Sequence, residues 1–191
     1  TKQLSLCWVM YAGDNDDNLV KNSIQGGNKQ SWIDPSFNMR NSSHAKDVRH
    51  LRQGKLFKYN ESLEIYQCPS QPIFGKGKSS YVPVRSYSMN GHIGGVFAEI
   101  SWVQGNQYPP RVKMADIINP PPSQSFVFLD EHENTIDDSF FAIPVYAAKH
   151  WQNSPSYWHN GGGTFGFADG HSEGHKCCLL YTSPSPRDSS K

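Results

Sequence analysis

The chain has 191 residues, of which 36% are hydrophobic and 13% aromatic, so it carries enough apolar side chains for the core of a single domain. Its formal net charge is only +1, and it has no run of Lys or Arg of the kind that binds nucleic acids or anionic membrane surfaces. These features exclude a nucleic-acid-binding domain and a polybasic membrane anchor.

Residues 177–191 differ from the rest of the chain. Residues 178–188 resemble the translation of a sequencing-library adapter, and a natural disordered Ser/Pro tail is the alternative. Neither would add to a core, so we expect one globular domain over residues 1–176 and a non-native tail over residues 177–191. The cysteines that remain, Cys7 and Cys68, are too few for a disulfide framework and form either two free thiols or one bridge.

The first predicted element is the end of an amphipathic helix over residues 1–13. Apolar side chains recur in it at the helical spacing i, i+3, i+4 and i+7, at Leu4, Cys7, Trp8 and Tyr11. The helix should therefore pack one face on a sheet and end at Gly13 and the polar residues that follow. Further apolar residues widen the stripe beyond what one sheet would cover: Leu6, Val9 and Met10.

Residues 14–18 place carboxylate and amide oxygens at alternate positions, as the start of a calcium-binding loop does. The EF-hand pattern fails, because its Gly position is Leu19 and its bidentate acid position is Gln25. Two interpretations remain, a bound Ca²⁺ or a solvated turn that caps the helix, and the turn is preferred. The candidate calcium ligands are Asp14, Asp16 and Asp17.

The middle of the chain predicts a long irregular connection, because residues 19–60 are rich in Asn, Ser, Gly and Lys. A short helix is expected near residues 47–53. Residues 64–68 predict a short strand ended by Pro69, and residues 85–89 predict another that ends at Asn90-Gly91.

Residues 126–129 form an apolar run that predicts a central strand, and polar residues follow it directly over residues 130–133. Acids and a histidine just past a strand end are a candidate metal-dependent hydrolase site, which Asp137, Asp138, His159 or Asp169 could join. However, the sequence has no HExxH motif, no nucleophile elbow and no cysteine dyad. We therefore expect a solvated loop here and no enzyme.

Residues 164–176 predict a β-hairpin around Asp169-Gly170, since a type I′ turn needs positive φ at both central positions. Phe165 and Phe167 alternate with small residues, so the first strand has an aromatic face, which we expect to rest on the core. The predicted register pairs Phe167 with Ser172 and Phe165 with Gly174.

In that register the polar side chains of the second strand, His171, Glu173 and His175, point away from the phenylalanines. They are either a zinc or copper site or the solvent face of a terminal hairpin. His159 precedes three glycines, and we expect its imidazole to hydrogen-bond the Asp169 carboxylate or a turn amide and so fix this loop against the hairpin.

Residues 144–158 alternate prolines, aromatic and polar residues, with Trp151 among the aromatics. Exposed aromatic rings stack on sugars, so a secreted carbohydrate-binding module is a competing function. More often such rings fill the core of a small α+β domain.

His159, nine intervening residues and Asp169-Gly170 match the H-x9-D-G hallmark, and the chain resembles the prepilin-like proteins that carry it, relatives of type IV pilins and type II secretion pseudopilins. The structural motif carried over is His159, Asp169 and Gly170. Further similar segments, in the family's order, extend the resemblance over most of residues 1–176: residues 2–16, 68–70, 85–91 and 128–132.

This resemblance implies an α+β, pilin-like fold in which an N-terminal α-helix packs on an antiparallel sheet with long irregular loops. It also implies the head of a bacterial subunit that assembles with other pilin-like subunits into a membrane-rooted filament for secretion or adhesion. A basic leader and an apolar helix would precede Thr1 and anchor the subunit in the inner membrane, on the periplasmic or cell-surface side. A secreted carbohydrate- or calcium-binding module is the alternative.

Overall fold

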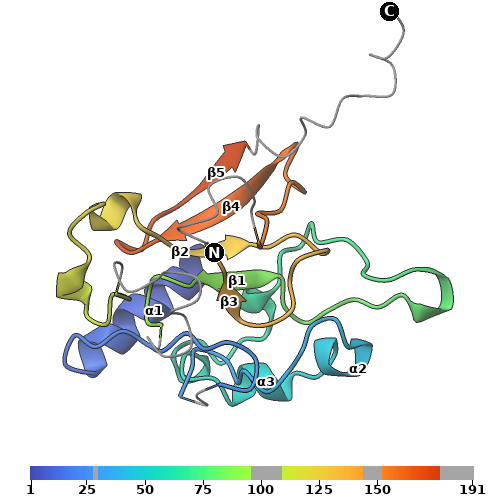
Figure 1. Cartoon of the computed structure of the whole chain (residues 1–191), viewed down its shortest axis with the longest axis horizontal. Helices are drawn as coiled ribbons and strands as arrows, with labels where there is room; N and C mark the ends of the chain where they lie inside the picture. Colours follow the sequence, from blue (N-terminus) through green and yellow to red (C-terminus); the bar gives the residue numbers. More distant parts are fainter. Residues whose placement is uncertain (28–29, 96–108, 144–151, 177–191) are drawn as a thin grey trace, which may run out of the picture.

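The computed structural model describes residues 1–27, 30–95, 109–143 and 152–176, which form an α+β fold (Figure 1). An N-terminal helix, α1 (Lys2–Asp14), lies against a five-stranded sheet. The strands are β1 (Tyr87–Asn90), β2 (Phe126–Asp130), β3 (Phe140–Phe141), β4 (Gly162–Phe167) and β5 (Ser172–Lys176). The connections carry the short helices α2 (Ser42–Ala45) and α3 (Arg49–Arg52) and the 3-10 turns η1 (Phe57–Tyr59), η2 (Glu64–Tyr66), η3 (Gly77–Ser79), η4 (Met114–Asp116) and η5 (Pro122–Gln124).

The sheet has the strand order β3-β1-β2-β4-β5, so β2 is central, as its apolar sequence predicts. The pairs β1–β2, β2–β4 and β4–β5 are antiparallel. However, β3 pairs with β1 in parallel, and the prediction of a wholly antiparallel sheet is wrong at this edge. The physical reason is the loop between β2 and β3, which reverses the chain and returns it beside β1 in the direction of β1.

Helix α1 forms where its apolar spacing predicts and packs one face into the core. Leu4 and Trp8 are completely buried in it, together with residues of the sheet and of the long connection. The helix ends at Asn15, whose side-chain Nδ2 donates a hydrogen bond of 2.6 Å to the carbonyl of Tyr11. The opposite face remains apolar and exposed, since Leu6 is 45% and Met10 53% exposed.

The face of β4 that meets α1 is the one with small residues. A Cβ atom added at Gly166 would lie 2.2 Å from Oγ of Ser5 on α1. Phe165 points to the other face, where its ring contacts that of Phe126 edge-on at 5.6 Å between centroids. The expectation that the aromatic face rests on the main core beside the helix is therefore wrong, because helix and sheet approach too closely for a large side chain.

Substitution Gly166→Ala tests this close approach. We expect it to lower the free energy of unfolding by about 1–3 kcal/mol, because the added methyl group overpacks the helix–sheet contact. Urea unfolding followed by circular dichroism measures it. The matched control is Gly13→Ala in α1, where an added Cβ meets nothing within 4 Å, and which should be neutral or stabilising. Equal stability of the two variants would contradict the packing.

The amide of Phe167 donates a hydrogen bond of 2.9 Å to the carbonyl of His171, so residues 168–170 form a three-residue hairpin loop instead of the predicted two-residue type I′ turn. Gly170 takes the left-handed conformation with φ +88°, whereas Asp169 does not take a positive φ, and its carboxylate accepts a hydrogen bond of 3.1 Å from the amide of His171. Phe165 consequently pairs with Glu173, one residue away from the predicted register.

A shift of one residue turns every side chain of a strand to the other face. The ring of His171 stacks on Phe167 at 4.4 Å between centroids, and the ring of His175 meets Phe165 edge-on at 5.2 Å. The prediction that the β5 histidines point away from the phenylalanines is therefore wrong.

The other predicted elements are confirmed except one. Helix α3 lies within residues 47–53, and β1 overlaps residues 85–89. The exception is the strand expected over residues 64–68, where η2 forms instead. A turn of 3-10 helix buries the ring of Tyr66, which stacks on Trp32 at 6.2 Å, and a short apolar run cannot distinguish these two structures. Cys7 and Cys68 are buried free thiols.

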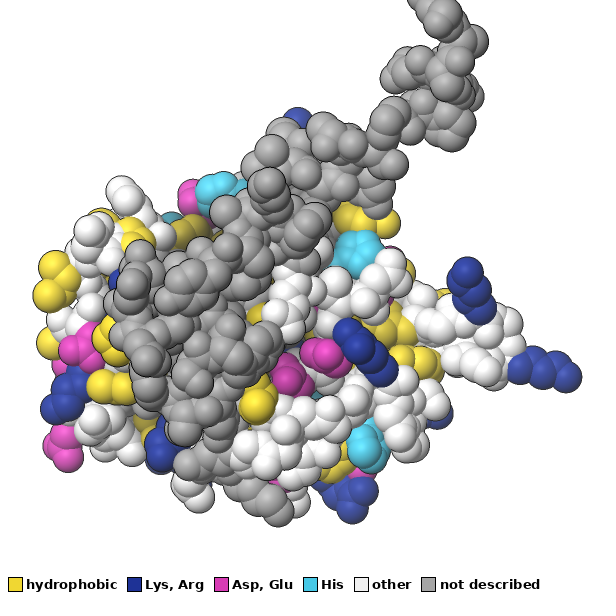
Figure 2. All heavy atoms as spheres, viewed as in Figure 1, with side chains coloured by type: hydrophobic (Ala, Val, Ile, Leu, Met, Phe, Trp, Pro, Cys, Tyr) yellow, Lys and Arg dark blue, Asp and Glu magenta, His cyan; other side chains and the backbone are white. Residues whose placement is uncertain are grey.

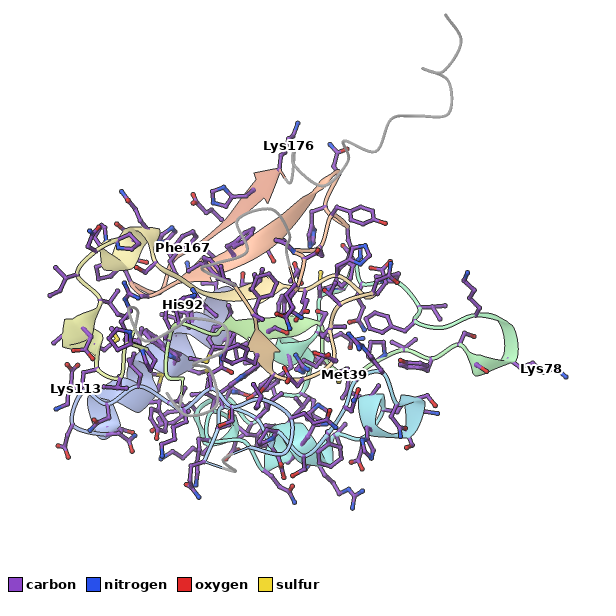
Figure 3. All side chains as sticks on the ribbon, viewed as in Figure 1. Met39, Lys78, His92, Lys113, Phe167 and Lys176 are labelled. Carbon is purple, nitrogen blue, oxygen red and sulfur yellow. The ribbon has the colours of Figure 1, made fainter. Side chains whose placement is uncertain are left out.

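The surface shows scattered charges. On the face in Figure 2, Lys and Arg side chains stand apart from one another, and Lys78 marks the tip of a loop that projects from the body (Figure 3). Phe74 and Tyr81 form the bridge at the base of this loop. Across the described part of the chain, no helix is both long enough and apolar enough to span a bilayer.

Candidate functional site

Cys68, Asp130 and His159 meet at one point, although they lie far apart in the sequence. The Nε2 atom of His159 is 3.2 Å from Sγ of Cys68 and 3.1 Å from Oδ2 of Asp130. The potential ligand atoms of all three residues lie within 4.8 Å of one another. We call these three residues the Cys68 cluster.

Hydrogen bonds hold two members of the Cys68 cluster in place. Cys68 follows η2, and its amide donates a hydrogen bond of 2.7 Å to Oγ of Ser86. Asp130 is the last residue of the central strand β2, and its Oδ2 accepts bonds from Thr164 on β4, at 2.6 Å from Oγ1 and 3.3 Å from the amide. Both Cys68 and Asp130 are buried, at 1% and 0% exposure.

His159 belongs to a tight loop just before β4. Its amide donates to the carbonyl of Gly162 at 3.0 Å, and the amide of Gly162 donates back at 3.1 Å. Asn160 and Gly161 make the turn possible by taking left-handed conformations, with φ of +52° and +81°. The side chain of His159 is 33% exposed, so the Cys68 cluster opens to solvent on this side.

Burial dominates the electrostatics around the Cys68 cluster. Burial raises the pKa of the Cys68 thiol, and the neighbouring Asp130 carboxylate raises it further. The pKa of Tyr87, which lies beside Cys68 and Thr164, is raised by the same two causes. A thiol in this setting remains protonated at neutral pH.

The arrangement does not match a cysteine–histidine–aspartate catalytic relay. In such a relay the thiol contacts one ring nitrogen and the carboxylate holds the other, so that the proton can pass through the ring. In the Cys68 cluster both the thiol and the carboxylate contact Nε2 of His159. A thiol, a carboxylate and an imidazole that converge on one point instead form a set of metal-ligand types.

The predicted hydrogen bond between His159 and Asp169 is wrong. The carboxylate partner of His159 is Asp130, while Asp169 pairs with the imidazole of His171 at the exposed hairpin tip. The reason is strand length, because β4 has six residues and places the two ends of the H-x9-D-G motif about 20 Å apart. Gly170, the third motif residue, supplies the positive φ of the hairpin loop.

The predicted site at residues 130–133 forms only in part: His159 joins Asp130, as the prediction allowed, whereas Glu131 and Glu133 point elsewhere. Oε1 of Glu131 accepts bonds from Asn153 (2.6 Å) and Thr135 (3.0 Å), and burial raises the pKa of Glu131 to about 8. Glu133 accepts a bond of 2.9 Å from the indole of Trp158. Glu131 and Glu133 therefore do not share a site with Asp130 and His159.

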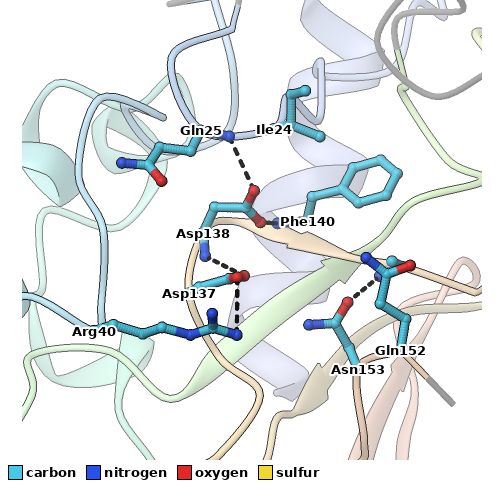
Figure 4. Close-up of a pocket in the computed structure, with 9 residues that line it drawn as sticks. Ile24, Gln25, Arg40, Asp137, Asp138, Phe140, Gln152 and Asn153 are labelled. Atoms are coloured by element: carbon cyan, nitrogen blue, oxygen red, sulfur yellow. Dashed lines mark hydrogen bonds and ion pairs between the residues drawn. The ribbon is translucent and has the colours of Figure 1, made fainter. Parts of the chain in front are cut away.

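Asp137 and Asp138 line a separate pocket of about 260 Å³, between the loop before β3 and the long connection (Figure 4). Asp137 pairs with Arg40 at 3.1 Å. Asp138 accepts bonds from the amides of Gln25 and Phe140, at 2.9 and 2.8 Å, and burial raises its pKa to about 6. Both acids therefore have partners from the protein itself.

The two candidate metal sites of the sequence are not gathered into ligand clusters. Within the described ranges, the Cys68 cluster is the group of His, Cys, Asp or Glu side chains that lie close enough together to share a metal ion. Asp16 and Asp17 have φ of +53° and +65°, which indicates the solvated turn after α1, and Asp14 does not converge with them. Just before β5, His171 pairs with Asp169, and on β5 His175 pairs with Glu173 at 2.6 Å.

The sequence did not predict that Cys68 would lie beside Asp130 and His159. Three of the segments that carry the pilin-like resemblance contain the three residues of the Cys68 cluster. The presence of one chemically reactive residue in each of these segments was the sequence signal that could have pointed to the cluster. Trp151, the candidate sugar platform, lies outside the described residues.

Comparison of the chain with family models, with curated proteins and with solved structures finds no significant match.

Proposed function

We propose that the chain is the globular head of a pseudopilin or type IV pilin-like subunit, which assembles into a membrane-rooted filament for secretion or adhesion. One observation carries the proposal: α1 is apolar on two faces. Its inner face is sealed by the sheet, with Leu4 and Trp8 completely buried, while Leu6 and Met10 remain exposed on the outer face. A helix that only closed its own domain would gain nothing from that outer face.

The surface beside the outer face of α1 has room for an apolar partner. Leu6 and Met10 border a shallow pocket of about 470 Å³, together with Tyr59 and Ile65 from the turns that flank the helix. In a filament of pilin-like subunits the helices lie side by side in the centre. The helix of a neighbouring subunit is therefore the occupant that this surface would receive.

A further observation agrees with an assembly subunit. The segments that resemble prepilin-like proteins belong to one folded unit, since α1, β1, β2 and the β4–β5 hairpin form a single helix–sheet body. The proposed location, the periplasm or the cell surface with an inner-membrane anchor, follows from the same resemblance.

Assembly can be tested in a bacterium that produces the protein and builds pilin-like filaments. We expect Leu6→Asp combined with Met10→Asp to abolish incorporation into sheared filaments, because two buried carboxylates would oppose helix packing. The purified head should lose less than about 0.5 kcal/mol of stability, since both side chains are exposed.

The control for the assembly test is Lys78→Asp, at the tip of the projecting loop (Figure 3). This variant should assemble as the wild type does. A Leu6→Asp/Met10→Asp subunit that enters filaments at the wild-type level would show that the outer face of α1 is not an assembly surface.

A further inference from the structure

The Cys68 cluster presents three different donor atoms to a single point. They are Sγ of Cys68 after η2, Oδ2 of Asp130 at the end of β2, and Nε2 of His159 before β4. Sulfur, carboxylate oxygen and imidazole nitrogen are the protein ligands of Zn²⁺, whereas Ca²⁺ and Mg²⁺ take oxygen ligands. The donor set therefore favours zinc among the common divalent ions.

The distances are close to those that zinc requires. A tetrahedral Zn²⁺ with its usual bond lengths separates sulfur, nitrogen and oxygen ligands by about 3.4–3.6 Å. The separations from Nε2 are 3.2 Å to sulfur and 3.1 Å to oxygen, so these two must each open by about 0.3 Å, while the sulfur and the oxygen lie within 4.8 Å of each other. His159 can supply this movement because its side chain reaches the surface from a loop.

Charge balance and the surrounding hydrogen bonds also suit zinc. With Cys68 as thiolate, Asp130 as carboxylate and His159 neutral, the three ligands neutralise a divalent ion, and the thiol proton passes to solvent on binding. Oγ1 of Thr164 already holds the Asp130 carboxylate at 2.6 Å, as the outer partners of metal ligands do.

We infer that the chain binds one Zn²⁺ ion through Cys68, Asp130 and His159, with a water molecule in the fourth position on the exposed side of His159. The ion ties together three segments that are remote in sequence, at the end of the central strand. This inference does not rest on the proposed function, since it concerns the folded head alone.

Cobalt substitution tests the inference directly. The reduced full chain is used in a background with Cys177→Ser and Cys178→Ser, so that cysteines outside the described residues cannot contribute. We expect one equivalent of Co²⁺ to produce a thiolate-to-cobalt charge-transfer band in the near ultraviolet together with tetrahedral visible bands, and Zn²⁺ to displace it. Zn²⁺ at 100 times its Kd should raise Tm by about 5–10 °C.

The two buried cysteines provide a matched pair of variants. Cys68→Ser should remove the charge-transfer band and lower zinc affinity at least about 100-fold. Cys7→Ser should leave the band and the affinity unchanged, because Cys7 lies on α1 against Asn60, away from the Cys68 cluster. Thr164→Val keeps all three ligands and should weaken zinc binding about 10–100-fold through the loss of the bond to Asp130.

Two results would overturn the inference. One is that the reduced Cys177→Ser/Cys178→Ser protein, with Cys68 intact, gives no charge-transfer band with Co²⁺ and no Tm shift with Zn²⁺. The other is a band that survives in Cys68→Ser. If Cys68→Ser does not fold, as judged by circular dichroism, Thr164→Val decides: unchanged zinc affinity in that variant counts against the site.

Discussion

Substitution Arg85→Ala is expected to lower the free energy of unfolding by about 3–5 kcal/mol. Arg85 is 1% exposed, and its guanidinium donates to the carbonyl of Tyr87, to Oγ of Ser88 at 3.1 Å and to the carbonyl of Asp138 at 2.7 Å. Removal of the side chain leaves these buried acceptors without their donor, and it also removes a positive charge that lowers the pKa of buried Glu131.

Two variants separate the causes of this loss. Arg85→Lys keeps the positive charge but cannot reach β1 and the loop before β3 at once, so we expect it to recover only part of the stability. Arg40→Ala removes an exposed arginine from its ion pair with Asp137 and should cost less than about 1 kcal/mol. Urea unfolding at pH 7 measures all three. An Arg85→Ala protein as stable as Arg40→Ala would contradict the structural role.

The sequence predicted those elements in which one face is strongly apolar. Helix α1 and the central strand β2 repeat apolar residues at a clear period, and both form where expected. The edge strand β3 has only two residues, so no periodic pattern could reveal it or its parallel direction. The register of the hairpin depends on whether Asp169 takes a positive φ, which the Asp-Gly pair alone does not determine.

The Cys68 cluster illustrates what sequence spacing cannot provide. Cys68 and His159 are separated by 91 positions, and only the packing of η2 and the loop before β4 against the end of β2 brings them together. The sequence singled out His159 and offered two acidic partners for it, Asp169 ten positions later and the polar residues 130–133. Asp169 lies at the far end of β4, and the partner of His159 is Asp130 on the adjacent strand β2.

Buried His50 is expected to make the protein less stable at acid pH. It is 1% exposed, and burial, followed by the charge of Arg85, lowers its pKa to about 4. In the unfolded chain a histidine binds a proton below about pH 6.5. As the pH falls below about 6.5, the unfolded state therefore gains a proton that folded His50 does not accept, and the folded state loses up to about 3 kcal/mol by pH 4.

Other buried groups act in the opposite direction, so the prediction concerns a difference between two proteins. The raised pKa values of Asp138 and Glu131 favour the folded state as the pH falls, in the wild type and in His50→Phe alike. Subtraction of the two curves of unfolding free energy against pH isolates His50. The free energy of unfolding of the wild type minus that of His50→Phe should be constant above about pH 7 and should fall steadily towards pH 4. A difference that stays flat through this range would show that His50 is protonated in the folded protein as readily as in the unfolded chain.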